Sequence, residues 1–130
     1  MLPAAARLTS SETFRRCVRS GRRAGSRTLV VHLALTGDQA GDQGGEHTSG
    51  PAQVGFVVSR GVGGAVVRNR VRRRLRHLVG DRLAALPPAS VVVVRALPAA
   101  ALASSEELRA DLGRCLERVA PAAAPPVMQP

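Results

Sequence analysis

The chain has 130 residues, the size of one domain with a single modest hydrophobic core. Its formal net charge is +10, and all 19 basic residues are arginine because the sequence contains no lysine. Such an excess predicts a polyanionic partner, either a nucleic acid or an anionic membrane surface. We expect no membrane span and no signal peptide, because the sequence has neither a long apolar run nor a basic leader followed by an apolar stretch.

The positive charge lies in two blocks. Residues 7–27 carry seven arginines and one acid, and residues 54–82 carry eight arginines and one acid. Between them, residues 28–53 hold no arginine and three acids, while residues 83–130 are neutral in sum. Folding could unite the two basic blocks into one surface or leave them as two separate contacts.

Few residues are candidates for catalysis or metal binding. Cys17 and Cys115 are far apart in the sequence, and we expect buried, reduced thiols in a cytoplasmic protein. His32, His47 and His77 have no second ligand at zinc spacing. The chain also lacks a Walker motif and a nucleophile elbow. The sequence therefore predicts neither a catalytic side chain nor a metal site on the protein.

The first predicted element is a helix over residues 10–20, which follows an irregular arm at residues 1–8. Thr9 and Glu12 have the spacing of a capping box, and Gly21 stands where a helix ends in a left-handed glycine. Helical spacing places three apolar side chains on one face, namely those of Phe14, Cys17 and Val18.

Two strands are predicted next, over residues 29–35 and 54–59, after a basic turn at residues 22–26. The glycine-rich, acidic stretch at 36–53 predicts a flexible loop that joins them as a hairpin. Alternation along the first strand assigns its larger aliphatic side chains to the core, namely those of Leu29, Val31, Leu33 and Leu35. The opposite face, with Val30 and His32, is then expected to be semi-exposed.

The second half of the chain predicts a helix at 65–79, a strand at 90–95 and a helix from about Ser104 to Val119. Four consecutive valines place the strand in the middle of a sheet. Ser104 and Glu107 form a second capping box. The proline-rich residues 120–130 predict a disordered tail. The order α-β-β-α-β-α predicts an α+β sandwich, with one domain over residues 1–119.

The helix at 65–79 is the strongest functional signal. Its apolar stripe is narrow, formed by Val67, Val71, Leu75 and Leu78, and arginines occupy the rest of the circumference. Arg72 and Arg76 lie one turn apart, so their repulsion destabilises the isolated helix until phosphates neutralise it. A solvated basic face and a membrane-surface helix are the alternatives, but the stripe is needed for the core and is too small for membrane insertion.

Three segments together resemble the protein subunit of bacterial ribonuclease P: residues 14–18, 54–59 and above all 65–76. The family's RNR helix corresponds to Arg68-Asn69-Arg70, and the resemblance extends from about Leu8 to Val119. It implies an α/β sandwich with a left-handed crossover around this helix. It also implies a subunit of an endoribonuclease ribonucleoprotein that removes the 5′ leader of precursor tRNA, with catalysis and most Mg²⁺ binding carried out by the RNA subunit.

The resemblance also implies two sets of binding residues. The residues expected to contact the RNA subunit are Arg60, Arg68, Asn69, Arg70, Arg72, Arg73 and Arg76. The leader is expected to bind in a cleft between the first helix and the sheet, lined by Phe14, Arg15, Val18, Val30, His32, Val57 and Ser59. His32 is either a group that contacts a leader nucleotide or a structural histidine. The implied partners are the RNA subunit and precursor tRNA, with no membrane and no obligate protein partner.

Some residues depart from the family pattern. Val18 and His32 stand where the family usually has aromatic side chains, which shifts weight from base stacking to contacts with the RNA backbone. Arg74 replaces a usually apolar residue, so its aliphatic stem must lie along the edge of the core. Two other functions remain open, a ribosomal or RNA-assembly protein and a DNA-binding module. The latter lacks a preceding helix close enough for a helix-turn-helix, and a nuclease acting alone lacks a carboxylate cluster.

Overall fold

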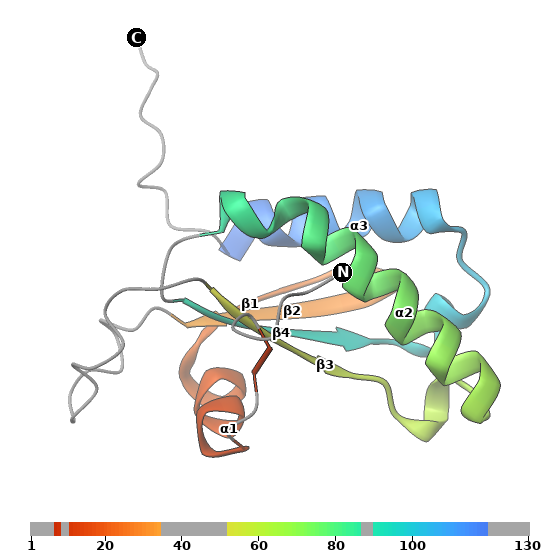
Figure 1. Cartoon of the computed structure of the whole chain (residues 1–130), viewed down its shortest axis with the longest axis horizontal. Coiled ribbons are helices and arrows are strands. Elements are labelled where there is room, and N and C mark those ends of the chain that lie inside the picture. Colours follow the sequence, from red (N-terminus) through yellow and green to blue (C-terminus); the bar gives the residue numbers. More distant parts are fainter. Residues whose placement is uncertain (1–6, 9–10, 35–51, 87–89, 120–130) are drawn as a thin grey trace, which may run out of the picture.

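The computed structural model describes residues 7–8, 11–34, 52–86 and 90–119 (Figure 1). Several sequence predictions fall outside them: the arm at 1–6, Thr9 of the first capping box, Leu35, His47, most of the loop at 36–53, and the tail at 120–130. The domain bounds of 1–119 therefore stay a prediction.

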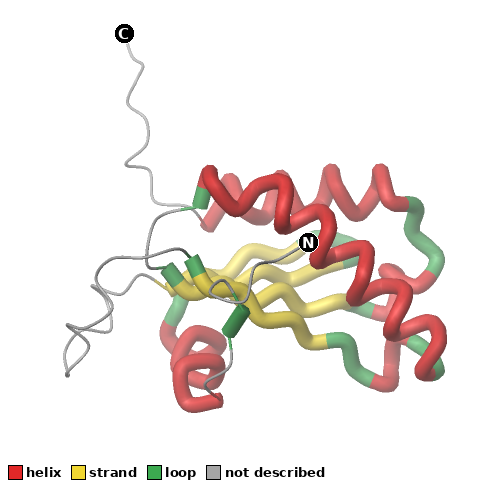
Figure 2. Tube along the Cα trace, in the orientation of Figure 1, coloured by secondary structure: helices red, strands yellow, loops and turns green. Residues whose placement is uncertain are grey.

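The described residues form a mixed α+β fold, which confirms the predicted class. Its helices are α1 (Ser11–Ser20), α2 (Ala65–Arg82) and α3 (Ser105–Val119). Its strands are β1 (Arg22–Gly25), β2 (Leu29–Ala34), β3 (Gln53–Val57) and β4 (Val91–Ala96), in the sheet order β1-β2-β4-β3. Figure 2 shows α2 and α3 on one side of the sheet and α1 on the other.

The basic turn predicted at residues 22–26 is wrong, because Arg22–Gly25 form strand β1. This strand pairs antiparallel with β2, from Arg22 opposite Leu33 to Gly25 opposite Val30. Only Ala24 of its four residues is buried, as suits a short strand at the edge of a sheet. An edge strand with one buried side chain has almost no alternation of apolar and polar residues, so the sequence did not predict it.

The predicted hairpin between the two following strands is also wrong. Strand β2 pairs with β4 in antiparallel fashion, and β3 pairs with β4 in parallel, so β4 separates the two. The four valines of β4 are buried on both faces, and the prediction of a central strand is confirmed. Because α2 connects β3 to its parallel neighbour β4, the three elements form a βαβ unit. The left-handed course of this unit stays a prediction.

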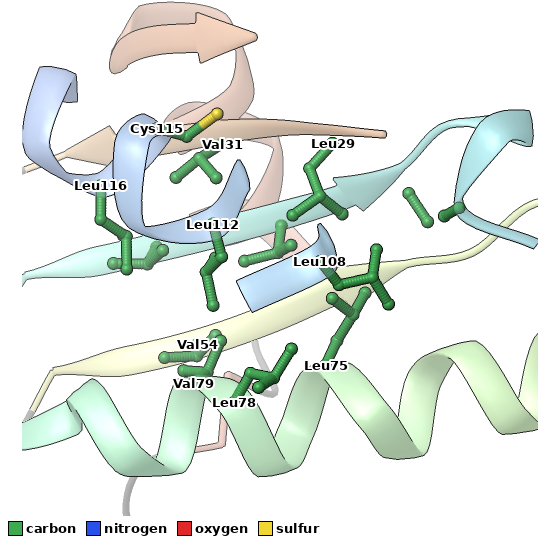
Figure 3. Close-up of a cluster of buried hydrophobic side chains, with 14 of the residues drawn as sticks. Leu29, Val31, Val54, Leu75, Leu78, Val79, Leu108, Leu112, Cys115 and Leu116 are labelled. Atoms are coloured by element: carbon green, nitrogen blue, oxygen red, sulfur yellow. The ribbon is translucent and has the colours of Figure 1, made fainter. Parts of the chain in front are cut away.

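The main core lies between the sheet and the two helices α2 and α3 (Figure 3). The predicted stripe of α2 is confirmed, since Val71, Leu75 and Leu78 are buried and Val67 is partly buried against the core. Helix α2 ends at Arg82 rather than at residue 79 and continues through Gly80. One interior glycine costs a helix about 1 kcal/mol, and burial of Leu78 and Val79 offsets that cost.

A smaller core lies on the opposite face of the sheet, beneath α1. Here Cys17 packs with Ala34, Val91 and Val93, and the partly buried Phe14 and Val18 lie against them, as their helical spacing predicted. At the end of α1, Gly21 does not have the predicted left-handed backbone, since Gly63 alone among the described glycines has a positive φ, 157°. A Cβ on Gly21 would instead lie 2.6 Å from the carbonyl oxygen of Cys17 and 2.7 Å from that of Leu33. Close backbone contact, not backbone conformation, therefore requires this glycine.

Helix α3 begins with the predicted capping box. The amide of Ser104 donates to Glu107 Oε1 at 2.8 Å, and the amide of Glu107 donates to Ser104 Oγ at 3.0 Å. Farther along α3, the buried carboxylate of Asp111 accepts a hydrogen bond from Thr28 Oγ1 at 2.6 Å and pairs with Arg114. These contacts tie α3 to the turn between β1 and β2.

Replacing Thr28 by valine is expected to lower the free energy of unfolding by about 1–3 kcal/mol at pH 7, because the buried carboxylate of Asp111 loses one of its hydrogen-bond donors. The hydrogen bond from Thr28 is the main cause that lowers the pKa of Asp111 below 3.8. This stabilisation is therefore present above pH 3.8 and is lost as the pH falls through the folded-state pKa. Urea unfolding at pH 7 and at lower pH measures the effect, with the exposed Ser105→Ala as control. Equal stability of Thr28→Val and the wild type at pH 7 would contradict it.

Both cysteines are free and buried, as predicted, and they lie on opposite faces of the sheet. Burial raises the pKa of the Cys17 thiol from 9.0 to about 11, and burial also raises that of Cys115. Because the Cys17 thiol is fully buried and its pKa is raised, we expect hardly any reaction with a disulfide reagent until the chain unfolds. Titration of thiols with and without urea tests this expectation, and rapid labelling of the folded protein would refute it.

Candidate nucleic-acid interface

The arginines of α2 occupy the surface that the buried stripe leaves to solvent. Asn69, Arg70, Arg73 and Arg76 are exposed, whereas Arg68 and Arg72 are half-buried. Arg60 is exposed in the short 3₁₀ turn, Arg60–Val62, that precedes the helix. The structure therefore gathers the predicted RNA-contacting residues on one helix and the turn that leads into it.

The positive charge of this helix is not compensated by neighbouring acids. Elsewhere arginines pair with carboxylates, Arg16 with Glu12 at 3.4 Å and Arg27 with Glu107 at 3.5 Å. In the parts of the chain that the structure describes, no arginine of α2 forms such an ion pair. The only acid of α2 is Asp81, one residue from its C-terminal end. Counterions or an anionic partner must therefore balance the charge.

Neutral acceptors orient three of these arginines. Arg68 Nε donates to the carbonyl oxygen of Gly63 at 3.2 Å, which ties the first residue of the RNR motif to the turn before the helix. Arg72 Nη1 donates to Asn69 Oδ1 at 3.5 Å. Arg74 Nη1 donates to the carbonyl oxygen of Ala103 at 3.3 Å, and the side chain is half-buried. This position confirms the prediction that Arg74 lies along the edge of the core.

The predicted leader residues lie around the face of the sheet that α1 covers in part. Phe14, Val18 and Val57 are half-buried against the core beneath α1, and Arg15 and Ser59 are exposed. The semi-exposed position expected for Val30 and His32 is wrong, since they are only 9% and 5% exposed. They are buried because β2 is an interior strand, flanked by the unpredicted β1 and by β4.

His32 lies between two cations on this face. Burial lowers the pKa of His32 below 6.5, and the charges of Arg95 and then Arg23 lower it further. The imidazole is consequently neutral near pH 7. Its Nδ1 is buried and has no hydrogen-bond partner within the described residues. His32 is thus neither a widely exposed stacking surface nor a core histidine with all its hydrogen bonds formed.

Sequence reasoning missed Arg23 and Arg95 as members of this face. Arg23 lies directly opposite His32 across the β1–β2 pair, and Arg95 lies opposite Val30 across the β2–β4 pair. Both arginines are exposed. The alternation of Val91, Val93 and Arg95 could have identified the second arginine, whereas the first required knowledge of β1. This face of the sheet therefore carries the positive charges of Arg23 and Arg95 in addition to that of Arg15, the one arginine that was predicted to contact the leader.

Metal-binding side chains do not gather in the described structure. Nowhere among these residues do three or more His, Cys, Asp or Glu side chains come together as a possible metal site. The described helices likewise include none with the length and apolar character needed to cross a membrane.

Comparison with known proteins shows which family the chain is similar to. The family model for ribonuclease P matches residues 2–120. The ribonuclease P protein component of a Nocardioides species is 57% identical over 119 residues, covering 92% of this chain and 95% of that protein. The component from Streptomyces bikiniensis is 56% identical over 119 residues, with the same coverage.

Solved structures show the same fold at lower identity. The ribonuclease P protein of Staphylococcus aureus superposes with a TM-score of 0.71 at 21% identity, covering 88% of this chain and 94% of that one. The protein of Thermotoga maritima gives a TM-score of 0.70 at 20% identity, covering 88% of this chain and 98% of that one. With a family model spanning nearly the whole sequence and relatives above half identity, the chain belongs to the ribonuclease P protein family.

Proposed function

We propose that this chain binds the catalytic RNA of ribonuclease P and the 5′ leader of precursor tRNA, and that it assists endonucleolytic removal of the leader. The uncompensated arginine face of α2 is the observation that carries the proposal. Membership of the ribonuclease P protein family supports the RNA subunit as the partner of this face.

The RNA subunit lies on α2 and on the turn before it. Phosphates neutralise the repulsion among Arg70, Arg73 and Arg76, and release of their counterions drives association. The hydrogen bond from Arg68 Nε to Gly63 leaves the two terminal nitrogens of that guanidinium available for a phosphate. Asn69, exposed on the same helix, can both donate to and accept from a base or a sugar.

The leader lies along the sheet face beside α1. Arg15, Arg23 and Arg95 supply positive charge there, and Ser59 supplies a hydroxyl group. Because Phe14 is half-buried and His32 is almost fully buried, backbone phosphates contribute more to leader affinity than base stacking does.

The RNA subunit and the substrate phosphates hold the Mg²⁺ ions that hydrolysis uses, and no side chain of the protein acts as nucleophile or general base. The protein contributes positive charge that offsets repulsion between two RNA molecules. This reduces the Mg²⁺ concentration at which the RNA subunit holds its substrate.

One reconstitution tests the proposal. The RNA subunit, the chain and precursor tRNA are combined at low Mg²⁺, and cleavage is compared with that by the RNA alone and by the protein alone. We expect the protein to increase cleavage by the RNA subunit and to cleave nothing by itself. No increase would refute the function and favour a different RNA-binding role, such as ribosome or RNA assembly. Cleavage by the protein alone would refute the absence of a catalytic side chain.

Replacing Arg95 by alanine is expected to weaken binding of precursor tRNA by roughly 3- to 10-fold, as for the loss of one charged contact. Mature tRNA, which lacks a leader, should bind the holoenzyme as before. Gel-shift or fluorescence titration of both RNAs measures the difference. Arg109→Ala, which removes an exposed arginine from α3, is the matched control. Equal losses for precursor and mature tRNA would place Arg95 outside the leader contact.

A further inference from the structure

A hollow of about 280 Å³ lies between α2 and the outer edge of β3, the edge that faces away from β4. Arg7 and Leu8 form one wall, Gly55 and Phe56 the second, and Arg72 and Arg76 of α2 the third. Neither Arg7 nor Phe56 was among the residues predicted to contact RNA. The hollow therefore brings two predicted RNA-contacting arginines together with two residues that have no assigned role.

The wall formed by Arg7 and Leu8 is held in place by the backbone of β3. The amide of Leu8 donates to the carbonyl oxygen of Val54 at 3.0 Å, and Arg7 pairs with Val54 as a short parallel bridge. A Cβ on Gly55 would lie 3.1 Å from Leu8 Cδ2 and 3.2 Å from Phe14 Cε2. The glycine thus allows Leu8 and α1 to lie directly on β3, which fixes Arg7 at the rim of the hollow.

The charge of this hollow distinguishes it from another on the molecule. A hollow of about 370 Å³ beside α3 is also lined by three arginines, but Glu107 and Asp111 lie among them and form ion pairs. The lining of the hollow at β3 includes three arginines and no acid. Uncompensated guanidinium groups around a concave site favour an anionic ligand with several phosphates.

Phe56 gives the hollow an aromatic wall. It is one of only two aromatic residues in the chain, and its side chain is half-buried against the main core. Backbone N–H and C=O groups point to alternate edges along a strand. The carbonyl of Val54 points to the outer edge of β3, where it accepts a hydrogen bond from Leu8, so the N–H and C=O of Phe56, two residues on, point to that edge as well. A flat ligand against Phe56 thus finds a backbone donor and acceptor nearby.

We propose that this hollow receives one unpaired nucleotide of the RNA subunit, with its base against Phe56 and its flanking phosphates on Arg7, Arg72 and Arg76. The volume lies near the lower end of small-ligand sites, roughly 300 Å³, and so suits one nucleotide rather than a longer segment. The inference rests on the proposed function, because it names the part of the RNA subunit that the α2 surface holds.

Affinity of the full chain for the RNA subunit, measured without substrate, tests the pocket. Phe56→Leu keeps an apolar side chain but removes the aromatic face, and we expect roughly 5- to 100-fold weaker binding. Phe56→Tyr keeps the ring and should bind like the wild type. Arg7→Ala removes a charge at an exposed position outside the core, and we expect about 3- to 10-fold weaker binding. Arg109→Ala on α3 is the control.

Dimethyl sulfate probing of the RNA subunit then locates the nucleotide. We expect at least one unpaired adenine or cytosine to be protected by the wild type and by Phe56→Tyr, and to react again with Phe56→Leu. Hydroxyl-radical protection of the neighbouring backbone should persist in all three complexes. Wild-type affinity and protection in both Phe56→Leu and Arg7→Ala would overturn the pocket while leaving the proposed function intact. Failure of the wild type to bind the RNA subunit would instead refute the proposed function.

Discussion

Replacing Arg72 and Arg76 together by alanine is expected to weaken binding of the RNA subunit by roughly 10- to 100-fold at moderate salt, through the loss of two phosphate contacts. The two side chains lie one turn apart on α2 and have no acidic partner among the residues that the structure describes. Each arginine that binds a phosphate releases counterions, so the log–log slope of affinity against salt should become shallower by about 1.4–1.8 in the double variant.

The matched control removes the same charge from another helix. Arg109 and Arg118 are exposed on α3 and form no ion pair within the described structure. Their double alanine variant should keep the wild-type affinity and salt slope, apart from a small change due to net charge. A wild-type slope in the Arg72→Ala/Arg76→Ala variant would place these two arginines off the RNA. Free of RNA, that variant should be as stable as the wild type or slightly more so, because repulsion along α2 is reduced.

Replacing Gly21 by alanine is expected to reduce the free energy of unfolding by about 2–3 kcal/mol, a large fraction of the stability of a small domain. The added methyl group would lie within 2.7 Å of two backbone carbonyl oxygens, those of Cys17 and Leu33. Backbone atoms of α1 and β2 cannot move aside as a flexible side chain can, so α1 must shift away from the sheet.

Urea unfolding measures this loss, with Gly25→Ala as the control. A Cβ on Gly25 would meet only the Val30 side chain at 3.7 Å, an ordinary contact, so that variant should keep wild-type stability. Because α1 and α2 lie on opposite sides of the sheet, Gly21→Ala protein that remains folded should bind the RNA subunit as the wild type does. Wild-type stability of Gly21→Ala would show that α1 can move without loss.

Much of the fold could be predicted because it depends on near neighbours in the sequence. The stripe from Val67 to Leu78 identified the buried face of α2, and a reciprocal pair of hydrogen bonds between Ser104 and Glu107 begins α3 as expected. Four consecutive valines indicated that β4 is central. In each case the signal and the structure that it predicts lie within a few residues of each other.

The errors concern contacts between residues far apart in the chain. Strand β1 has only one buried side chain, and it forms because it pairs with β2. Its own residues therefore gave no strand pattern and were predicted to form a turn. The position of β4 between β2 and β3 follows from the crossover through α2, which a hairpin prediction cannot anticipate. Both errors affect the exposure that was expected for His32. Strand β2 lies between β1 and β4 in the interior of the sheet, so the side chain of His32 is buried instead of semi-exposed.

The sequence by itself determined that the protein has an α+β fold and that one of its helices is rich in arginine and has a single apolar stripe. The resemblance of the RNR segment indicated the family. Composition and helical spacing suffice for those conclusions, because charge and periodicity are properties of the chain. Only the tertiary structure decided which arginines have no acidic partner among the described residues, and only it brought Arg7 and Phe56 beside Arg72 and Arg76. Those groupings depend on strand pairing and helix packing, which join residues that no local pattern connects.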